Sequence, residues 1–152
     1  MFLWLETTSI ARWVGESYYA YPALLSVHII GLAIVVGLSS MRDLKLLGLF
    51  PAVQLHQLAG LKRIALGGFL LNVFSGFLLF SSQASYLISS LPFVLKIGLV
   101  TAGMVLTIII NRQVAVAGES SQQNSKQHRI LAVASLLIWL AAIVAGRLIA
   151  YV

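Results

Sequence analysis

Four long apolar stretches alternate with short polar segments along the chain, and they predict four transmembrane helices. We expect these helices at about residues 20–40, 64–82, 93–111 and 129–150. Each stretch holds close to the ~20 residues that an α-helix needs to cross a ~30 Å hydrocarbon core. The alternation over ~10-residue strands that is typical of a membrane barrel is absent. Because backbone amides cannot stay unpaired in lipid, the pattern predicts an all-α integral membrane protein.

The remaining segments complete a single domain over residues 1–152. Residues 2–18 are too polar to span a membrane but carry apolar side chains at helical spacing, which predicts an amphipathic helix on the membrane surface. Tyr18, Tyr19 and Tyr21 then form an aromatic anchor at the interface. Because the loops between the spans are short, we expect consecutive helices to be adjacent and antiparallel in an up-down-up-down bundle.

Composition supports the membrane assignment and excludes several function classes. The chain is 60% hydrophobic and 9% charged, whereas soluble domains carry roughly 25% charged residues. Cysteine is absent, so disulfides, thiolate metal sites and cysteine nucleophiles are excluded. The sequence has no phosphate-binding glycine loop and no HExxH motif, and no span has paired carboxylates. These absences disfavour a monomeric enzyme or transporter.

The distribution of positive charge predicts the orientation. One side of the predicted membrane has seven cations, namely Arg42, Lys45, Lys62, Arg63, Arg112, Lys126 and Arg129. The other side has three, which are Arg12, Lys96 and Arg147. Cytoplasmic loops carry the excess of Lys and Arg. We therefore expect both termini outside, which is the periplasmic face of a bacterial inner membrane.

A few polar side chains lie within the predicted spans, and such residues are candidate functional sites. Those that we expect near a bound cofactor are His28, Lys96, Arg147, Met104 and Asn72. A buried histidine ligates a haem iron, relays a proton or makes an interhelical hydrogen bond, and all three remain open. His28 and Met104 lie at similar depth and form a possible axial pair. His56 and His128 lie at the cytoplasmic interface, so neither can face His28 across a porphyrin.

Contacts with other helices or with a partner are expected at a second set of residues, Glu16, Trp139 and Gly146. Small or short residues at four-residue steps, Gly68, Asn72 and Gly76, let helix backbones approach closely, and we favour contacts within the bundle for them. Lys96 and Arg147 together could bind an anionic or quinone group. No metal site is expected, because His56 and His128 lack third and fourth ligands.

Motifs spread over nearly the whole chain resemble a group of small four-helix bacterial inner-membrane proteins known as a domain of unknown function. They are Trp4-Leu5, Glu16-Ser17, Tyr21-Pro22, Val27-His28-x-x-Gly31, Arg42-Asp43-Leu44-x-Leu46-x-Gly48-Leu49, Gly76-x-Leu78-Leu79-Phe80-Ser81, Pro92-Phe93-x-x-Lys96, Leu137-x-Trp139 and Ala145-Gly146-Arg147-x-Ile149-Ala150-Tyr151. The resemblance implies a four-helix membrane fold without an established activity. It also implies a histidine near the end of the third span, where this chain has Asn111, and that difference argues against a two-histidine haem site.

These patterns favour a non-catalytic membrane subunit that packs in, anchors or stabilises a larger bacterial membrane assembly, such as a redox complex. Its expected surroundings are lipid and either other membrane subunits or further copies of itself, and nucleic acid is not expected. The first alternative is an electron carrier that binds a b-type haem or a quinone through His28. A weaker alternative is an oligomeric permease for a small molecule or a metal.

Overall fold

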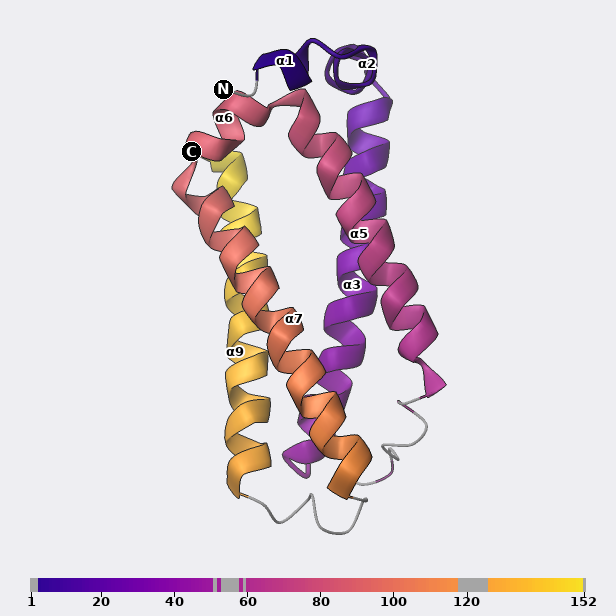
Figure 1. The fold of residues 1–152 in the computed structure, drawn as a ribbon, viewed down its shortest axis with the longest axis vertical. Helices are drawn as coiled ribbons and strands as arrows, with labels where there is room; N and C mark the ends of the chain where they lie inside the picture. The colour runs from indigo at the N-terminus through magenta and orange to yellow at the C-terminus, as the bar shows by residue number, and fades with distance from the viewer. Residues whose placement is uncertain (1–2, 51, 53–57, 59, 118–125, 152) are drawn as a thin grey trace.

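The computed structural model describes residues 3–50, 52, 58, 60–117 and 126–151, and every regular element in these ranges is a helix. In chain order (Figure 1) they are α1 (Leu3–Glu6), α2 (Ser9–Glu16), α3 (Ala20–Leu46), α5 (Lys62–Ser82), α6 (Ala84–Ser89), α7 (Leu91–Ala117), α9 (Lys126–Leu148) and the 3-10 turn η1 (Ile149–Tyr151). Within the described ranges α3, α5, α7 and α9 are long and apolar enough to cross a membrane. The predicted all-α four-helix fold is confirmed.

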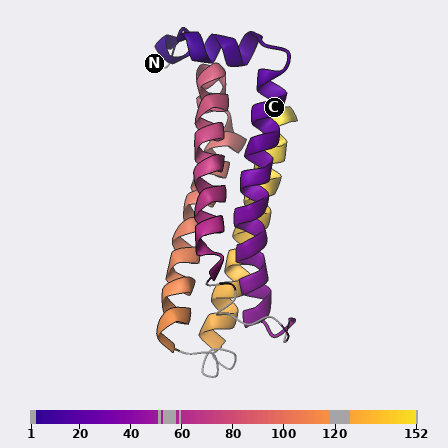
Figure 2. The same ribbon diagram turned by 90° about the vertical axis from the view of Figure 1, so that its right-hand side faces the viewer.

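The four long helices run side by side, and α1 and α2 lie across one end of them (Figures 1 and 2). We call that end the outer end and the opposite one the inner end. α3 packs against α5, α7 packs against α9, and α3 joins the two pairs through α9. The consecutive spans α5 and α7 do not pack closely along their length, which differs from the expected adjacency. The short helix α6 lies between them in the chain, and the stacked rings of Phe80 and Phe93 bridge them, with centroids 5.4 Å apart.

The buried residues in the interior of the bundle are mostly small or polar, whereas the side chains on its outer surface are strongly apolar. The buried residues of α3 and α5 are His28, Gly31, Val35, Ser39, Arg42, Asp43, Leu46, Gly68, Asn72 and Ser75, with Ala20 and Ser81 at the outer end. Large side chains such as Ile29, Phe74 and Leu140 are exposed instead. Lipid tails are as apolar as these side chains, so helices in a membrane associate through close packing and hydrogen bonds. This distribution, with small and polar residues inside and large apolar side chains outside, is typical of a protein whose solvent is lipid.

Glycines bring the backbones of α3 and α5 into direct contact. A Cβ atom placed on Gly31 would lie 2.7 Å from the carbonyl oxygen of Gly68 and 2.8 Å from the amide nitrogen of Asn72. A Cβ atom on Gly68 would lie 2.7 Å from the Cγ2 atom of Ile34. No larger residue fits at either position without separating the helices. The four-residue spacing of small residues in α5 therefore serves contacts within the bundle, as the sequence predicted.

A small apolar cluster closes the inner end of the bundle. Leu46 of α3, Ile110 of α7 and Ala132 of α9 are fully buried at its centre. Partly buried aliphatic side chains surround them, namely Leu47, Leu58, Leu106, Val114 and Leu131. This cluster joins α3 to the α7–α9 pair by apolar packing at the inner end.

The amino-terminal segment forms two short helices, although the sequence predicted one helix over residues 2–18. The break follows from Thr8, whose side chain accepts a hydrogen bond from the backbone N–H of Ala11 at 3.3 Å and so caps a new helix. Ala11 and Val14 are buried against the bundle, whereas Ile10 and Trp13 are more than half exposed. Apolar residues therefore lie both on the face that packs against the bundle and on the exposed side of this segment. Such an amphipathic segment is typical of a helix that lies on the membrane surface.

The same segment is tied to the loop between α5 and α7. Glu6 Oε1 accepts a hydrogen bond of 2.6 Å from the backbone N–H of Ser85, in the first turn of α6. The first-turn amides of a helix lack partners within the helix, and a carboxylate satisfies them well. This contact fixes α1 over α6 and places both at the outer end.

We expect Gly31→Ala to destabilise the bundle by about 1–3 kcal/mol, because its methyl group would overlap the backbone of α5. Gly37→Ala is the matched control on the same helix, since a Cβ atom there meets nothing within 4 Å. That control should be neutral or should stabilise α3 by up to about 1 kcal/mol. Unfolding in detergent followed by circular dichroism measures both, and equal stabilities for the two variants would contradict the close contact of α3 and α5.

Candidate functional site

His28 sits where α3, α5 and α7 meet in the outer half of the bundle. Its Nδ1 atom lies 3.0 Å from the carbonyl oxygen of Asn72 and 3.3 Å from the hydroxyl of Ser75, both on α5. Its Nε2 atom lies 3.3 Å from Lys96 Nζ on α7 and 3.5 Å from Asn72 Nδ2. The Asn72 amide also donates to the carbonyl oxygen of His28 at 2.9 Å. Both ring nitrogens are thus engaged by neighbouring helices.

These neighbours define the tautomer of His28. A carbonyl oxygen can accept a hydrogen bond but cannot donate one, so Nδ1 carries the proton that faces the Asn72 carbonyl. The groups next to Nε2 are an ammonium and an amide NH₂, and both are donors. An unprotonated Nε2 accepts from them, whereas a protonated one would face them donor to donor. The geometry therefore fits a neutral imidazole that is protonated on Nδ1.

Small residues make room for this cluster. A Cβ atom on Gly76 of α5 would lie 2.9 Å from His28 Cε1, so the imidazole lies directly on the α5 backbone. On α9, a Cβ atom at Gly146 would lie 3.3 Å from Cε of Lys96, so the lysine stem packs on that helix. Ser75 is completely buried, and its hydroxyl donates a hydrogen bond of 2.6 Å to the Leu71 carbonyl. All four spans contribute to the surroundings of His28 and Lys96.

A second polar cluster lies nearer the inner end and is built on the neighbouring residues Arg42 and Asp43 of α3. Both are buried, with exposures of 5% and 0%. Two guanidinium nitrogens of Arg42, Nε and Nη2, donate to Asp43 Oδ1 at 2.8 and 2.6 Å. Its Nη1 donates to the Thr107 carbonyl at 3.2 Å and to Asn111 Oδ1 at 2.9 Å, both on α7. This ion pair therefore connects α3 to α7.

Asp43 extends the cluster towards α9. Its carboxylate interacts with the buried hydroxyl of Ser135, although Asp43 Oδ2 and Ser135 Oγ do not meet in regular hydrogen-bond geometry. One turn outward, the hydroxyls of Ser39 and Thr107 lie 3.5 Å apart and add a weak contact between α3 and α7. Arg42 and Asp43 are adjacent in the sequence just after the predicted span, but the sequence predicted neither their burial nor their contacts with two other helices.

The structure brings together three of the five residues expected near a cofactor, namely His28, Asn72 and Lys96. Met104 is half-buried on α7, and none of the contacts to the ring nitrogens of His28 comes from it. Arg147 is exposed at the outer end, where it donates to the Tyr151 hydroxyl at 3.2 Å and lies over that ring. The geometry does not support a joint anion or quinone site of Lys96 and Arg147, because Gly146 rather than Arg147 faces the lysine.

The residues expected at contacts fall into two groups. Trp139 is 1% exposed, and its indole ring packs flat on Gly103 of α7, where a Cβ atom would lie 3.0 Å away. Trp139 and Gly146 therefore belong to contacts between the helices of this chain and not to a surface open to a partner. Glu16 is exposed at the end of α2. His56 lies outside the described residues, so its expected place at the cytoplasmic interface stays a prediction.

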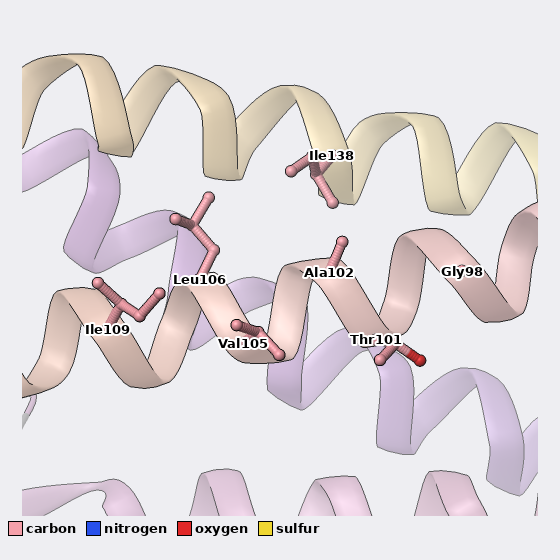
Figure 3. Close-up of a pocket in the computed structure, with 7 residues that line it drawn as sticks. All are labelled: Gly98, Thr101, Ala102, Val105, Leu106, Ile109 and Ile138. Atoms are coloured by element: carbon pink, nitrogen blue, oxygen red, sulfur yellow. The ribbon is translucent and has the colours of Figure 1, made fainter.

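A shallow apolar groove runs along the lipid-facing side of α7, next to α9 (Figure 3). It encloses about 550 Å³ and is lined by Gly98, Thr101, Ala102, Val105, Leu106, Ile109 and Ile138. Ala102 and Leu106 point towards α9, and Ile138 points back at them. The Thr101 hydroxyl donates to the Ile97 carbonyl, which hides its polarity. The groove is thus a lipid-facing surface with unusually small residues at one end.

Metal binding has no support in the part of the chain that the structure describes. No three His, Cys, Asp or Glu side chains come together there as ligands. The candidate chemistry of the described residues is therefore that of hydrogen bonding and charge at His28 with Lys96 and at Arg42 with Asp43.

We expect the ¹⁵N spectrum of His28 to show a neutral imidazole protonated on Nδ1, because Nδ1 faces a carbonyl oxygen and Nε2 faces two donors. Solid-state NMR of protein labelled in histidine and reconstituted in lipid measures this. The His28→Gln variant identifies which signal belongs to residue 28. A signal of the Nε2-protonated tautomer would contradict the contact between His28 and Lys96.

We expect Arg42→Met to destabilise the protein by about 3–5 kcal/mol, because it leaves the buried Asp43 carboxylate without its cation. The double variant Arg42→Met with Asp43→Leu should recover most of that loss, since no buried charge remains. Arg63→Met, at an exposed position of α5, is the control and should change little. Unfolding in mixed micelles compares the variants, and a double variant as unstable as Arg42→Met alone would contradict this account.

Comparison of the chain with profiles of known protein families, with curated protein sequences and with solved structures finds no match.

Proposed function

We propose that this chain is a small, non-catalytic membrane subunit that packs against other membrane-embedded chains and stabilises a larger bacterial assembly, such as a redox complex. The observation that carries the proposal is the outward face of α7. That face has an apolar groove of about 550 Å³, and the small residues Gly98 and Ala102 line one end of it. Small residues on a lipid-facing surface allow another helix to approach closely.

The use of polar groups supports the same proposal. The polar contacts described in the interior join the helices of the chain to one another, as those of His28 and Arg42 do. An enzyme or a carrier would present such groups towards a substrate. The exterior, by contrast, is an apolar surface without reactive groups. Such a surface is typical of a subunit that packs against other chains and anchors them.

The proposal includes a location in a bacterial inner membrane with both termini in the periplasm. The inner end of the bundle would then carry the seven cations between the spans, in agreement with the excess of positive charge in cytoplasmic loops. The helices α1 and α2 would lie on the periplasmic surface, with the exposed side chains of Trp4 and Trp13 in the interface.

An electron carrier with a b-type haem on His28 is less well supported. Axial ligation uses the lone pair of a ring nitrogen, but Nδ1 faces a carbonyl and Nε2 faces Lys96 at 3.3 Å. A haem would have to displace the lysine and separate α7 from α3. A quinone needs no such change, because its carbonyl oxygens accept hydrogen bonds and require no lone pair from the protein. The oligomeric permease has no supporting contact among the described residues.

We expect a photoreactive amino acid at Val105, in the groove, to cross-link to one defined membrane protein in the native host. The matched control is Leu70 on α5, because the two side chains are 52% and 57% exposed. Mass spectrometry of the adducts identifies the partner and its stoichiometry. Adducts with lipid alone, adducts with a second copy of this chain, or the same adducts from both positions would argue against a subunit that docks through α7.

A further inference from the structure

Lys96 is a cation inside a membrane span without a counter-ion among the described residues. An ammonium has three N–H groups, and one of them donates to His28 Nε2 at 3.3 Å. No second hydrogen bond or ion pair of Lys96 occurs in the described ranges, where the salt bridge of Arg42 with Asp43 lies at the inner end. A charge in a membrane is costly unless it is paired. Two donors of Lys96 therefore have no acceptor among the described residues and can meet one on another molecule.

The position of Lys96 favours a ligand that dissolves in hydrocarbon. Lys96 is the sixth residue of α7, which begins at Leu91, so it lies roughly 8 Å along the helix from its outer end at 1.5 Å per residue. The side chain is half-buried and leans on Gly146, so part of its surface stays accessible. Bringing a lipid phosphate to this depth would bury a second ion. A neutral molecule with a carbonyl oxygen reaches it without that cost.

Two aromatic rings lie just outward of this position. Phe93 precedes Lys96 by three residues on α7, and Phe80 follows Gly76 by four residues on α5, so each ring lies about one helical turn outward on the same helix face. The rings are stacked, with centroids 5.4 Å apart and planes inclined by 11°. Inward of this bridge α5 and α7 do not pack closely. A planar ring that reached Lys96 from the lipid side would lie just inward of the stacked rings.

We infer that Lys96 binds a carbonyl oxygen of a membrane-soluble quinone, whose ring lies below the Phe80–Phe93 pair and whose apolar tail extends into lipid between α5 and α7. The ammonium donates a charge-assisted hydrogen bond, which is stronger than a neutral one. His28 is a positioning residue, because its Nε2 atom accepts from Lys96 and holds the amine at the level of the site. This binding needs no partner subunit, so its test is independent of the proposed docking face of α7.

The experiment uses Trp139 as the reporter. The chain has three tryptophans, so a background with Trp4→Phe and Trp13→Phe leaves Trp139, which packs on Gly103 seven residues inward of Lys96. Decylubiquinone is titrated into the delipidated protein in detergent, and quenching of Trp139 fluorescence is followed. We expect saturable quenching. Decylbenzene, which has the tail but no carbonyl, should not compete with it.

Substitutions then assign the site. Lys96→Met should weaken binding of decylubiquinone about tenfold or more, as expected for loss of one charge-assisted hydrogen bond. Lys62→Met removes an exposed lysine at the inner end and should leave the Kd within about twofold. Lys96→Arg keeps a cationic donor and should retain most of the affinity. Circular dichroism verifies that each variant is folded, and the decylbenzene comparison tests the inference even if Lys96→Met does not fold.

Three results would overturn the inference. The first is quenching that rises linearly without saturation in every variant, which indicates simple partitioning of the quinone into the micelle. The second is saturable quenching that Lys96→Met leaves unchanged. The third is displacement of decylubiquinone by phosphatidylglycerol but not by uncharged lipid, which would assign the donors of Lys96 to a lipid phosphate.

Discussion

The fold depends on direct contact between the backbones of α3 and α5. In lipid, apolar surface gains nothing by leaving its solvent, so helices need close packing and hydrogen bonds to associate. Gly31 and Gly68 supply the close packing, and the exchange of hydrogen bonds between His28 and Asn72 supplies the second element. The two act together, because the imidazole reaches the α5 carbonyl only when the helices touch. Loss of either contact would leave His28 and Asn72 as unsatisfied polar groups in hydrocarbon.

Two sets of polar contacts join this helix pair to α7 at different depths. Lys96 meets His28 near the outer end, and Arg42 meets Thr107 and Asn111 near the inner end. His28 and Arg42 are fourteen residues apart on α3, or roughly 21 Å at 1.5 Å per residue. Two sets of contacts at that separation fix both the tilt and the rotation of α7 relative to α3. Trp139 fills the space between them by packing on Gly103, so α9 is held to α7 in the same layer.

Much of this architecture could be predicted from the sequence, because the membrane imposes helices of defined length and the spacing of small residues indicates their contact faces. Depth along the spans placed His28 and Met104 at a similar level. Rotation about each helix axis could not be predicted, since almost every side chain of these spans is apolar and gives no amphipathic signal. For that reason the sequence left open a site shared by Lys96 and Arg147, whereas in the structure Gly146 packs on the lysine. The extent of the Arg42 cluster was missed for the same reason, although two opposite charges adjacent in an apolar span were a visible signal.

The adjacency of Arg42 and Asp43 in the chain has a consequence for membrane insertion. Helices enter the bilayer in the order of synthesis, so α3 resides there before α7 and α9 exist. An arginine that depended on a later helix for its counter-ion would be exposed to lipid during that interval. Here the neutralising carboxylate is the next residue, and it can close on the guanidinium as soon as the first span is made. The Nη1 group of Arg42 meets its acceptors only when α7 is in place, so the charge is compensated early and the contact between helices is added late.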